Sequence, residues 1–288
     1  MTTTRVLRPP RRAVQPSPGE RARSLLGRDY LSYSAVSTYQ KCPLKFCFQY
    51  VVSLEPEFVS SSLVFGSAIH AAIEHHFRKL FEGAEPPSCE ELVAEYDRAW
   101  SAEPSATIRF GQGETPESLH DLAGRMLEVF WASSLSKLDT SAELLAVEEE
   151  FRGPIIPDCP DILGRVDLVL ADAERLRIID FKTSRSAWGD AKIQEALPQQ
   201  LLYVELLRPL ARSLGIDQIE MEWVVLTKTR NPGITLHTAS PTPTDIAHTR
   251  ATVRHVWQAV EAEHFYPCPS TINCPGCPFQ QACRAWEG

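Results

Sequence analysis

The sequence predicts an α/β (α+β) fold in which a mixed sheet is flanked by helices. Up to about residue 140 the apolar side chains recur mainly at helical spacing, whereas three consecutive segments after Glu143 are apolar and rich in residues that favour strands. A helix, a further strand and another helix follow. Strands that alternate with helices pack into a sheet covered by helices, so the two halves together predict this architecture.

Four helices are expected in the first half. Ser32 or Ser34 can cap the first of them. This helix runs towards Tyr50 and is interrupted at Pro43, whose ring does not fit a helix interior. The other three are expected at 63–81, 89–100 and 117–135.

In the second half, strands are expected at 144–151, 162–170, 176–182 and 219–226, and helices at 193–214 and 244–263. We therefore divide the chain into a disordered basic arm at 1–29 and one folded domain at 30–288. The domain consists of a helical part at about 30–140, a core at about 141–263 that contains the expected strands, and a cysteine-rich tail at 264–288.

The composition indicates a protein without membrane spans, because no run of 18 apolar residues occurs. Residues 1–29 contain seven Arg and four Pro against two acidic residues. They lack the apolar segment of a secretory signal, so we expect a cytoplasmic protein. An Arg-rich start also suits an organelle transit peptide, but the prolines oppose the amphipathic helix that such a peptide needs. A disordered basic arm is therefore favoured.

The strongest chemical signal is a pair of segments on adjacent predicted strands, Gly164-Arg165-Val166-Asp167 and Ile179-Asp180-Phe181-Lys182-Thr183. If Leu170 pairs with Arg175 across a short turn, Asp180 is a diagonal neighbour of Asp167, roughly 7–8 Å away on the same face. Lys182 points to that face as well, because strand side chains alternate with a period of two. A register shift of one residue would break this geometry.

This arrangement suits the hydrolysis of a phosphodiester. Two carboxylates can hold Mg²⁺ or Mn²⁺, and the metal polarises the phosphate and acidifies its water. A nearby lysine can orient or deprotonate that water and stabilise the transition state. An ordinary hairpin with surface Asp and Lys is the alternative. The apolar strand before Asp180, and the Gly-x-x-Asp strand at hairpin distance from it, favour a catalytic site.

Eight cysteines in a chain without an export signal are atypical of a disulfide framework. Cys274, Cys277 and Cys283 lie within ten residues, and Cys42 and Cys47 lie near the start. The Cys274-x2-Cys277 pair could form half of a zinc site, but zinc normally requires a second nearby pair. Only one further local ligand, Cys283, is available, so a fourth ligand would come from far upstream.

The two acidic segments resemble the core motif of PD-(D/E)XK nucleases, with Asp167, Asp180 and Lys182 at the matching positions. Four further segments are similar, in the same order, to motifs of the RecB-like branch of that superfamily. They are Leu31-Ser32-Tyr33-Ser34 with Tyr39 and Cys42-Pro43, Phe65-Gly66-Ser67-Ala68-Ile69-His70, Gln199 with Tyr203, and Cys274-x2-Cys277-x5-Cys283. Each motif is weak alone, but together and in order they are specific, and the resemblance spans residues 31–285.

The resemblance implies a restriction-endonuclease-like fold with a metal site. The metal ligands would be His70, Asp167, Asp180 and the backbone carbonyl of Phe181. An imidazole among oxygen ligands favours Mn²⁺ somewhat over Mg²⁺. Glu148, Gln199 and Tyr203 would be accessory residues, although Glu148 lies in a charge run and helix packing explains Tyr203 almost as well.

The same resemblance implies a 4Fe-4S cluster that joins the two ends of the domain. Its ligands would be Cys42, Cys274, Cys277 and Cys283, and thiolates are the usual ligands of such clusters. Cys47 and Cys268 are rival ligands, and the Cys-Pro context favours Cys42. Zinc at these thiolates is the alternative.

We therefore expect a metal-dependent DNA exonuclease that acts on single strands or ends in repair, recombination or defence. The net charge of −8 does not exclude DNA, because a metal site itself collects carboxylates. No Gly-x-x-x-x-Gly-Lys-Ser/Thr loop occurs, so a separate helicase or other DNA-processing protein is an expected partner. A CRISPR adaptation nuclease and a non-cutting, nucleic-acid-binding member of the fold are the alternatives.

Overall fold

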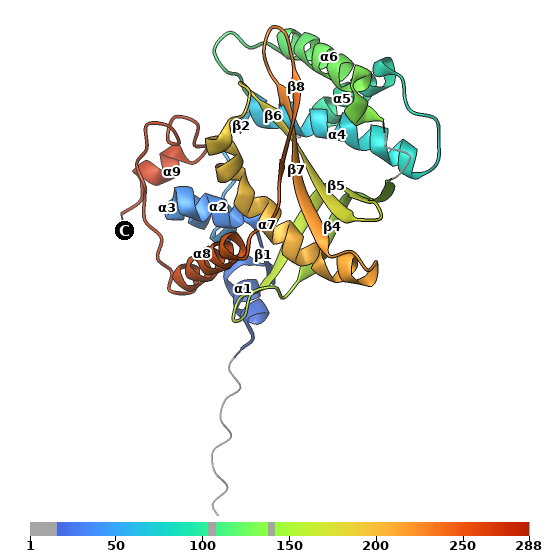
Figure 1. Ribbon diagram of the computed structural model, residues 1–288. Coiled ribbons are helices and arrows are strands. Elements are labelled where there is room, and N and C mark those ends of the chain that lie inside the picture. The colour runs from blue at the N-terminus through green and yellow to red at the C-terminus, as the bar shows by residue number, and fades with distance from the viewer. Residues whose placement is uncertain (1–15, 103–107, 138–141, 288) are drawn as a thin grey trace, which may run out of the picture.

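The computed structural model describes residues 16–102, 108–137 and 142–287, and a mixed sheet lies at its centre (Figure 1). Within these residues the sheet has six strands in the order β1–β5–β6–β7–β8, and β4 pairs with β5. Their bounds are β1 (Tyr30–Ser32), β4 (Glu143–Gly153), β5 (Asp161–Ala171), β6 (Arg175–Ser184), β7 (Gln218–Thr227) and β8 (Ile234–Ala239). The β1–β5 and β6–β7 pairs are parallel and the others antiparallel. The predicted mixed sheet is confirmed.

Helices cover both faces of this sheet (Figure 1). On one face α4 (Ser61–Phe81), α5 (Cys89–Ala102) and α6 (Pro116–Ala132) enclose an apolar core with Leu168 and Ile179. On the other, α7 (Asp190–Ser213) and α8 (Pro243–Glu261) enclose a second core with Val169 and Ile178. Adjacent residues of β5 and β6 thus face opposite cores, as the period of a strand requires.

The β5–β6 hairpin closes with a different register from the expected one. Leu170 pairs with Arg177, two residues further along than predicted. The cause is the turn, in which the Asp172 carboxylate accepts the backbone N–H groups of Glu174 and Arg175 at 2.9 Å. Because side chains alternate with a period of two, a shift of two residues keeps the paired residues 168–171 of β5 on their predicted faces.

The N-terminal arm is shorter than predicted. Residues 18–26 form α1 (Pro18–Leu26), which begins with a capping box between Ser17 and Glu20. Ala22 and Leu26 are buried in the core under α7 and α8. The predicted disordered arm is therefore wrong for this segment, since its apolar residues at helical spacing bind it to the domain. Residues 1–15 lie outside the described part of the chain.

The first predicted helix is divided as Pro43 suggested. Ser32 caps α2 (Tyr33–Lys41) by accepting the N–H of Ala35, and α3 (Pro43–Phe46) begins at the proline. A π-helical segment (Cys47–Val51), β2 (Val59–Ser60), β3 (Ile108–Arg109), a 3₁₀ turn (Ser134–Ser136) and α9 (Gln280–Arg284) complete the described elements. Within the residues that the structure places, we find no helix with both the length and the apolar character of a membrane span.

Candidate active site

Two strands share one edge of β5 and leave a gap between them. β4 occupies the opposite edge from residue 162 to residue 171. On the shared edge β1 pairs with residues 161–163, and β6 pairs with residues 168–171. Residues 164–167 have no strand partner on this edge, so Asp167 lies where β1 and β6 diverge. The short strand β1 was not predicted, yet it defines one side of the opening.

Both β4 and β5 change their alternation at this gap. Val166 packs in the core under α7 and Leu168 in the core under α4, although residues two apart in a regular strand share a face. In β4, Val147 faces α4 whereas Phe151 faces α7, and Glu148 between them has a left-handed φ of 48°. Such a backbone costs on the order of 1–3 kcal/mol for a residue other than glycine and is typical of functional sites.

The altered strands bring two carboxylates to a histidine on α4. The His70 Nδ1 atom lies 3.5 Å from Asp167 Oδ2 and 3.8 Å from Glu148 Oε1. One ligand atom from each of the three residues lies within 4.8 Å of the others, as binding to one cation requires. A set of one imidazole and two carboxylates suits Mg²⁺ or Mn²⁺. Of the predicted ligands, the structure therefore joins His70 and Asp167, and it adds Glu148.

The electrostatics of these three side chains are those of a site that needs a cation. Burial lowers the pKa of His70, but Asp167 and Glu148 outweigh burial and the net shift is upwards. Burial raises the pKa of Asp167 to about 7, with His70 acting in the opposite direction. Burial also raises the pKa of Glu148, whereas His70 and Arg165 lower it, and the net shift is downwards. A protonated His70 or a metal ion can supply the positive charge that the carboxylates require.

Asp180 and Lys182 form a second group beside the first. The Lys182 ammonium lies 2.5 Å from Asp180 Oδ2, and Asp180 is 2% exposed. Lys182 also donates to Gln199 Oε1 at 3.3 Å, and Gln199 donates to the Tyr203 hydroxyl at 2.8 Å. Burial lowers the pKa of Lys182, but Asp180 and Asp167 together outweigh burial and the net shift is upwards. In this structure Asp180 therefore pairs with the lysine and lies outside the three-residue group.

The backbone of Phe181 connects the two groups. Its N–H donates to Asp167 Oδ2 at 2.7 Å, which fixes the carboxylate just beyond the last pair of the hairpin, Leu168 and Ile179. The contact holds the carboxylate in one orientation although β5 and β6 have separated there. The role of the Phe181 carbonyl as a metal ligand stays a prediction.

Gly164 connects the hairpin to α7. A Cβ atom at this position would lie 2.6 Å from Tyr203 Cε1 and 3.0 Å from Leu206 Cδ1, closer than side chains approach. We predict that Gly164→Ala displaces the tyrosine ring, breaks its hydrogen bond to Gln199, and lowers the free energy of unfolding by about 1–3 kcal/mol. Chemical denaturation measures the loss. Gly189→Ala, where no atom lies within 4 Å of the added Cβ, is the matched control.

One residue at the site had no role in the sequence argument. Arg165 is 56% exposed, and its Nε atom lies 2.7 Å from Glu148 Oε2 and its Nη2 atom 3.7 Å from Glu74 Oε2. It occupies a variable position of the Gly-x-x-Asp segment, so no sequence signal marked it. Its charge faces the free oxygen of Glu148, which keeps that carboxylate ionised.

A second site lies where the cysteines of the tail meet Cys42, around a cavity. A space of about 510 Å³ is lined by the predicted ligands Cys42, Cys274, Cys277 and Cys283, and also by Cys268. Burial raises the pKa of the Cys283 thiol, and the other three predicted ligands add to the shift because they are close. Cys47 does not line the cavity. The structure therefore brings the four predicted thiols together.

The spacing of these thiols bears on the choice between zinc and a cluster. Four sulfur atoms around one tetrahedral zinc lie about 3.8 Å apart, given Zn–S bonds of about 2.3 Å. Throughout the described residues, no three thiols lie within 4.8 Å of one another. The described thiols are therefore not preset around a single zinc ion, and the choice of metal stays a prediction.

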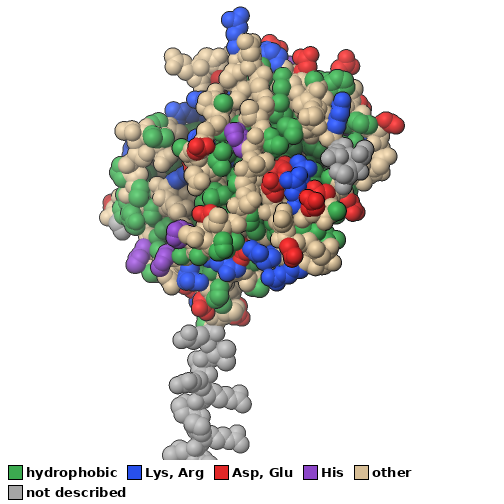
Figure 2. Space-filling view, in the orientation of Figure 1, with side chains coloured by type: hydrophobic (Ala, Val, Ile, Leu, Met, Phe, Trp, Pro, Cys, Tyr) green, Lys and Arg blue, Asp and Glu red, His purple; other side chains and the backbone are tan. Residues whose placement is uncertain are grey.

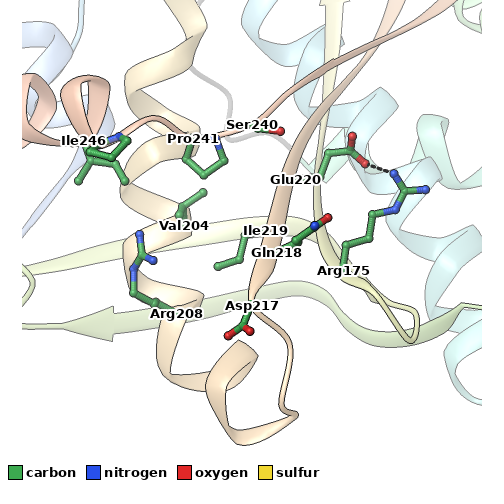
Figure 3. A pocket seen from close by; sticks show the side chains of 11 residues that line it. Arg175, Val204, Arg208, Asp217, Gln218, Ile219, Glu220, Ser240, Pro241 and Ile246 are labelled. Atoms are coloured by element: carbon green, nitrogen blue, oxygen red, sulfur yellow. Dashed lines mark hydrogen bonds and ion pairs between the residues drawn. The ribbon is translucent and has the colours of Figure 1, made fainter.

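A further cavity lies away from this chemistry. It measures about 430 Å³ and lies where β6 and β7 begin (Figure 3). Arg175 and Glu220 on its wall are paired at 2.6 Å. None of His70, Glu148, Asp167, Asp180 and Lys182 lines it, so we assign it no part in the reaction.

A mixed sheet flanked by helices, with a possible acidic metal site at a gap between its strands, is the arrangement of a hydrolytic nuclease. The chain belongs to the PD-(D/E)XK nuclease superfamily, whose family model matches residues 30–284. The protein is therefore a nuclease by family, and the expected family is confirmed.

The chain is similar to solved structures at low sequence identity. A candidate exonuclease from Eubacterium rectale has a TM-score of 0.55 and 12% identity, over 90% of this chain and 88% of that chain. SSO0001 has a TM-score of 0.36 and 17% identity over 88% and 95% of the two chains. LHK-Exo in complex with dAMP has a TM-score of 0.28 and 12% identity over 72% and 89%. No curated protein matches the sequence.

Proposed function

We propose that this nuclease is a metal-dependent exonuclease of the RecB-like branch that acts on single-stranded DNA or on DNA ends. One observation carries the proposal. The Lys182–Asp180 pair lies beside the His70–Glu148–Asp167 group at the gap in the sheet, and the N–H of Phe181 links the two. A phosphodiester placed there would meet a metal site and a cation together.

The residues have separate roles in this proposal. Mg²⁺ or Mn²⁺ would be held by His70, Asp167, Asp180 and the Phe181 carbonyl, with Glu148 as a further ligand. When bound, the ion polarises the phosphate and lowers the pKa of water. Lys182 orients the attacking water and neutralises charge on the phosphate, and its hydrogen bond to Gln199 keeps its ammonium at the site.

The tail would hold a 4Fe-4S cluster through Cys42, Cys274, Cys277 and Cys283. The cluster has a structural role in this proposal, since it would tie the N-terminal helices to the tail. Because the chain carries no phosphate-loop motor, a helicase in trans would supply single strands from long duplexes.

Lys182→Ala tests the catalytic assignment. We expect the Mn²⁺-dependent degradation of labelled single-stranded DNA to fall about 10²- to 10³-fold, the usual cost of losing a charged group that stabilises the transition state. Lys192→Ala, which removes an exposed lysine paired with Glu195 on α7, should retain wild-type rates. Equal activity of wild type and Lys182→Ala would refute the assignment. Rapid degradation of blunt duplex by the protein alone would refute the preference for single strands.

A further inference from the structure

A second polar position lies on the same face of α4 as the metal-site histidine. Ser62, Gly66 and His70 follow each other at intervals of four residues, so they form one row along the helix. Gly66 faces Thr183 at the end of β6, with its added Cβ position 3.5 Å from Thr183 Oγ1. The row therefore lies beside the carboxyl end of β6, the strand that carries Asp180 and Lys182. Ser62 lies two turns before His70, about 12 Å along the helix axis.

A lysine without a carboxylate partner contacts this row. Lys228 directly follows β7, and its backbone N–H donates to the carbonyl of Ser184 at 2.6 Å. Its Nζ atom donates to Ser62 Oγ at 2.7 Å and lies 5.4 Å from the centre of the Phe65 ring. As far as the described residues extend, no carboxylate lies within 4.0 Å of this ammonium, in contrast to Lys182.

The neighbouring charges leave this position positive. Arg185, which follows β6, is 76% exposed and lies 3.8 Å from Glu114. That carboxylate is already hydrogen-bonded, since it accepts the Ser61 hydroxyl at 2.6 Å and the Gly111 N–H at 2.9 Å. Two cations thus face one carboxylate at the N-terminus of α4, where the helix dipole adds positive potential. Burial lowers the pKa of Lys228, and Arg185 lowers it further. An anion bound here would therefore stabilise the charged forms of both side chains.

We propose that Lys228, with Ser62 and Arg185, binds a backbone phosphate of the substrate strand at a distance from the cleaved bond. The inference rests on the proposed function. At the rise of about 3.4 Å per nucleotide in a stacked strand, 12 Å corresponds to three or four nucleotides. On the face shown in Figure 2, basic side chains are interspersed with acidic ones. Acidic residues outnumber Lys and Arg in this chain, whose net charge is −8. A lysine without a carboxylate partner, on the same helix row as His70, is therefore well suited to bind a phosphate of the DNA strand.

Equilibrium binding of a fluorescently labelled oligothymidylate of 12 nucleotides, measured with Ca²⁺ in place of Mg²⁺ or Mn²⁺, tests the proposal. We expect Lys228→Gln to weaken binding about three- to tenfold. The slope of log Kd against log salt concentration should fall by about 0.7, the value for one phosphate contact with a single strand. Lys228→Arg should restore the slope, because it keeps the charge. Lys192→Gln removes a lysine that is paired with Glu195 and should leave both quantities at the wild-type value.

The outcomes are distinguishable. If Lys228→Gln keeps the wild-type Kd and salt slope, the phosphate site is wrong and the proposed function stands. If the wild type itself binds no oligothymidylate, the proposed function fails. A dinucleotide is too short to reach from the cleaved bond to Lys228, so an equal loss on a dinucleotide would also overturn the site. Should Lys228→Gln fold poorly, Lys228→Met keeps the aliphatic stem over Phe65 and removes only the charge.

Discussion

Asp167→Asn is expected to reduce hydrolysis by at least about a thousandfold and, at pH 8, to make the metal-free protein more stable than the wild type. The loss of activity follows from the position of Asp167, which joins His70 and Glu148 in the proposed metal site. Removing a carboxylate ligand forfeits several kcal/mol of charge stabilisation in the transition state. An amide is a weak ligand for a divalent cation, whereas it can still accept the N–H of Phe181.

The gain in stability follows from the pKa of the same group. Burial raises the pKa of Asp167 from 3.8 to about 7, so the folded state disfavours its charged form. The contribution of Asp167 to the stability of the metal-free wild type is therefore fully present below about pH 4. This contribution is lost as the pH rises through 7. The pKa rises by about three units at 1.36 kcal/mol each, so the loss in the free energy of unfolding is at most about 4 kcal/mol. Asparagine does not titrate, so the variant escapes this loss.

Thermal melts at pH 5 and pH 8, with and without Mn²⁺, measure both effects. The variant should exceed the wild type in Tm by more at pH 8 than at pH 5. Mn²⁺ should raise the Tm of the wild type only, since a ligand stabilises the state that binds it. Asp190→Asn, at the exposed start of α7, is the control that should change neither activity nor metal response. A wild-type response to Mn²⁺ in Asp167→Asn would show that the metal binds elsewhere.

Much of the fold was open to prediction because its signals are local. The cap at Ser32, the break at Pro43 and the apolar periodicity of α4 depend only on neighbouring residues. The same local reasoning failed for α1, where prolines and arginines outweighed the capping box at Ser17. It also missed β8, a short edge strand without a strongly apolar sequence.

The site was predictable in its parts and not in its geometry. The hairpin segments were recognisable, but the two-residue register shift depends on a side chain of the turn, Asp172. Glu148 has a left-handed backbone within a paired strand, and nothing in its sequence context marks this position. The contact between Gly164 and Tyr203 joins a strand to a helix nearly forty residues later. Such long-range contacts come from packing, which one sequence does not encode locally.

Cys283→Ser is expected to remove the proposed iron–sulfur cluster and to release the tail, with a fall in Tm on the order of 10 °C. The apolar contacts there are too small to hold the tail alone, since Leu44, Phe48 and Phe279 form the whole local core among the described residues. Burial of three such side chains contributes roughly 5–9 kcal/mol before the entropy of ordering some twenty residues is subtracted. The proposed cluster would supply the difference, because metal binding and folding are coupled.

Release of the tail should also weaken catalysis, although less than a change in the hairpin. Glu57 donates its N–H to the Pro278 carbonyl at 2.9 Å, and its carboxylate accepts the N–H of Gln281 at 2.7 Å. The segment that holds Glu57 leads through β2 to Ser60, the cap of α4. Loss of these contacts loosens the start of the helix that carries His70.

Visible absorbance, iron content and limited proteolysis of anaerobically purified protein measure the cluster and the tail. Cys283→Ser should lose colour and iron, and cleavage should begin after residue 264 while the hairpin stays protected. Cys47→Ser is the matched control, because Cys47 lies near Cys42 in sequence but does not line the cavity. Iron retained by Cys283→Ser, or lost from Cys47→Ser, would contradict the ligand set. Zinc in place of iron in the wild type would keep the tether and change its metal.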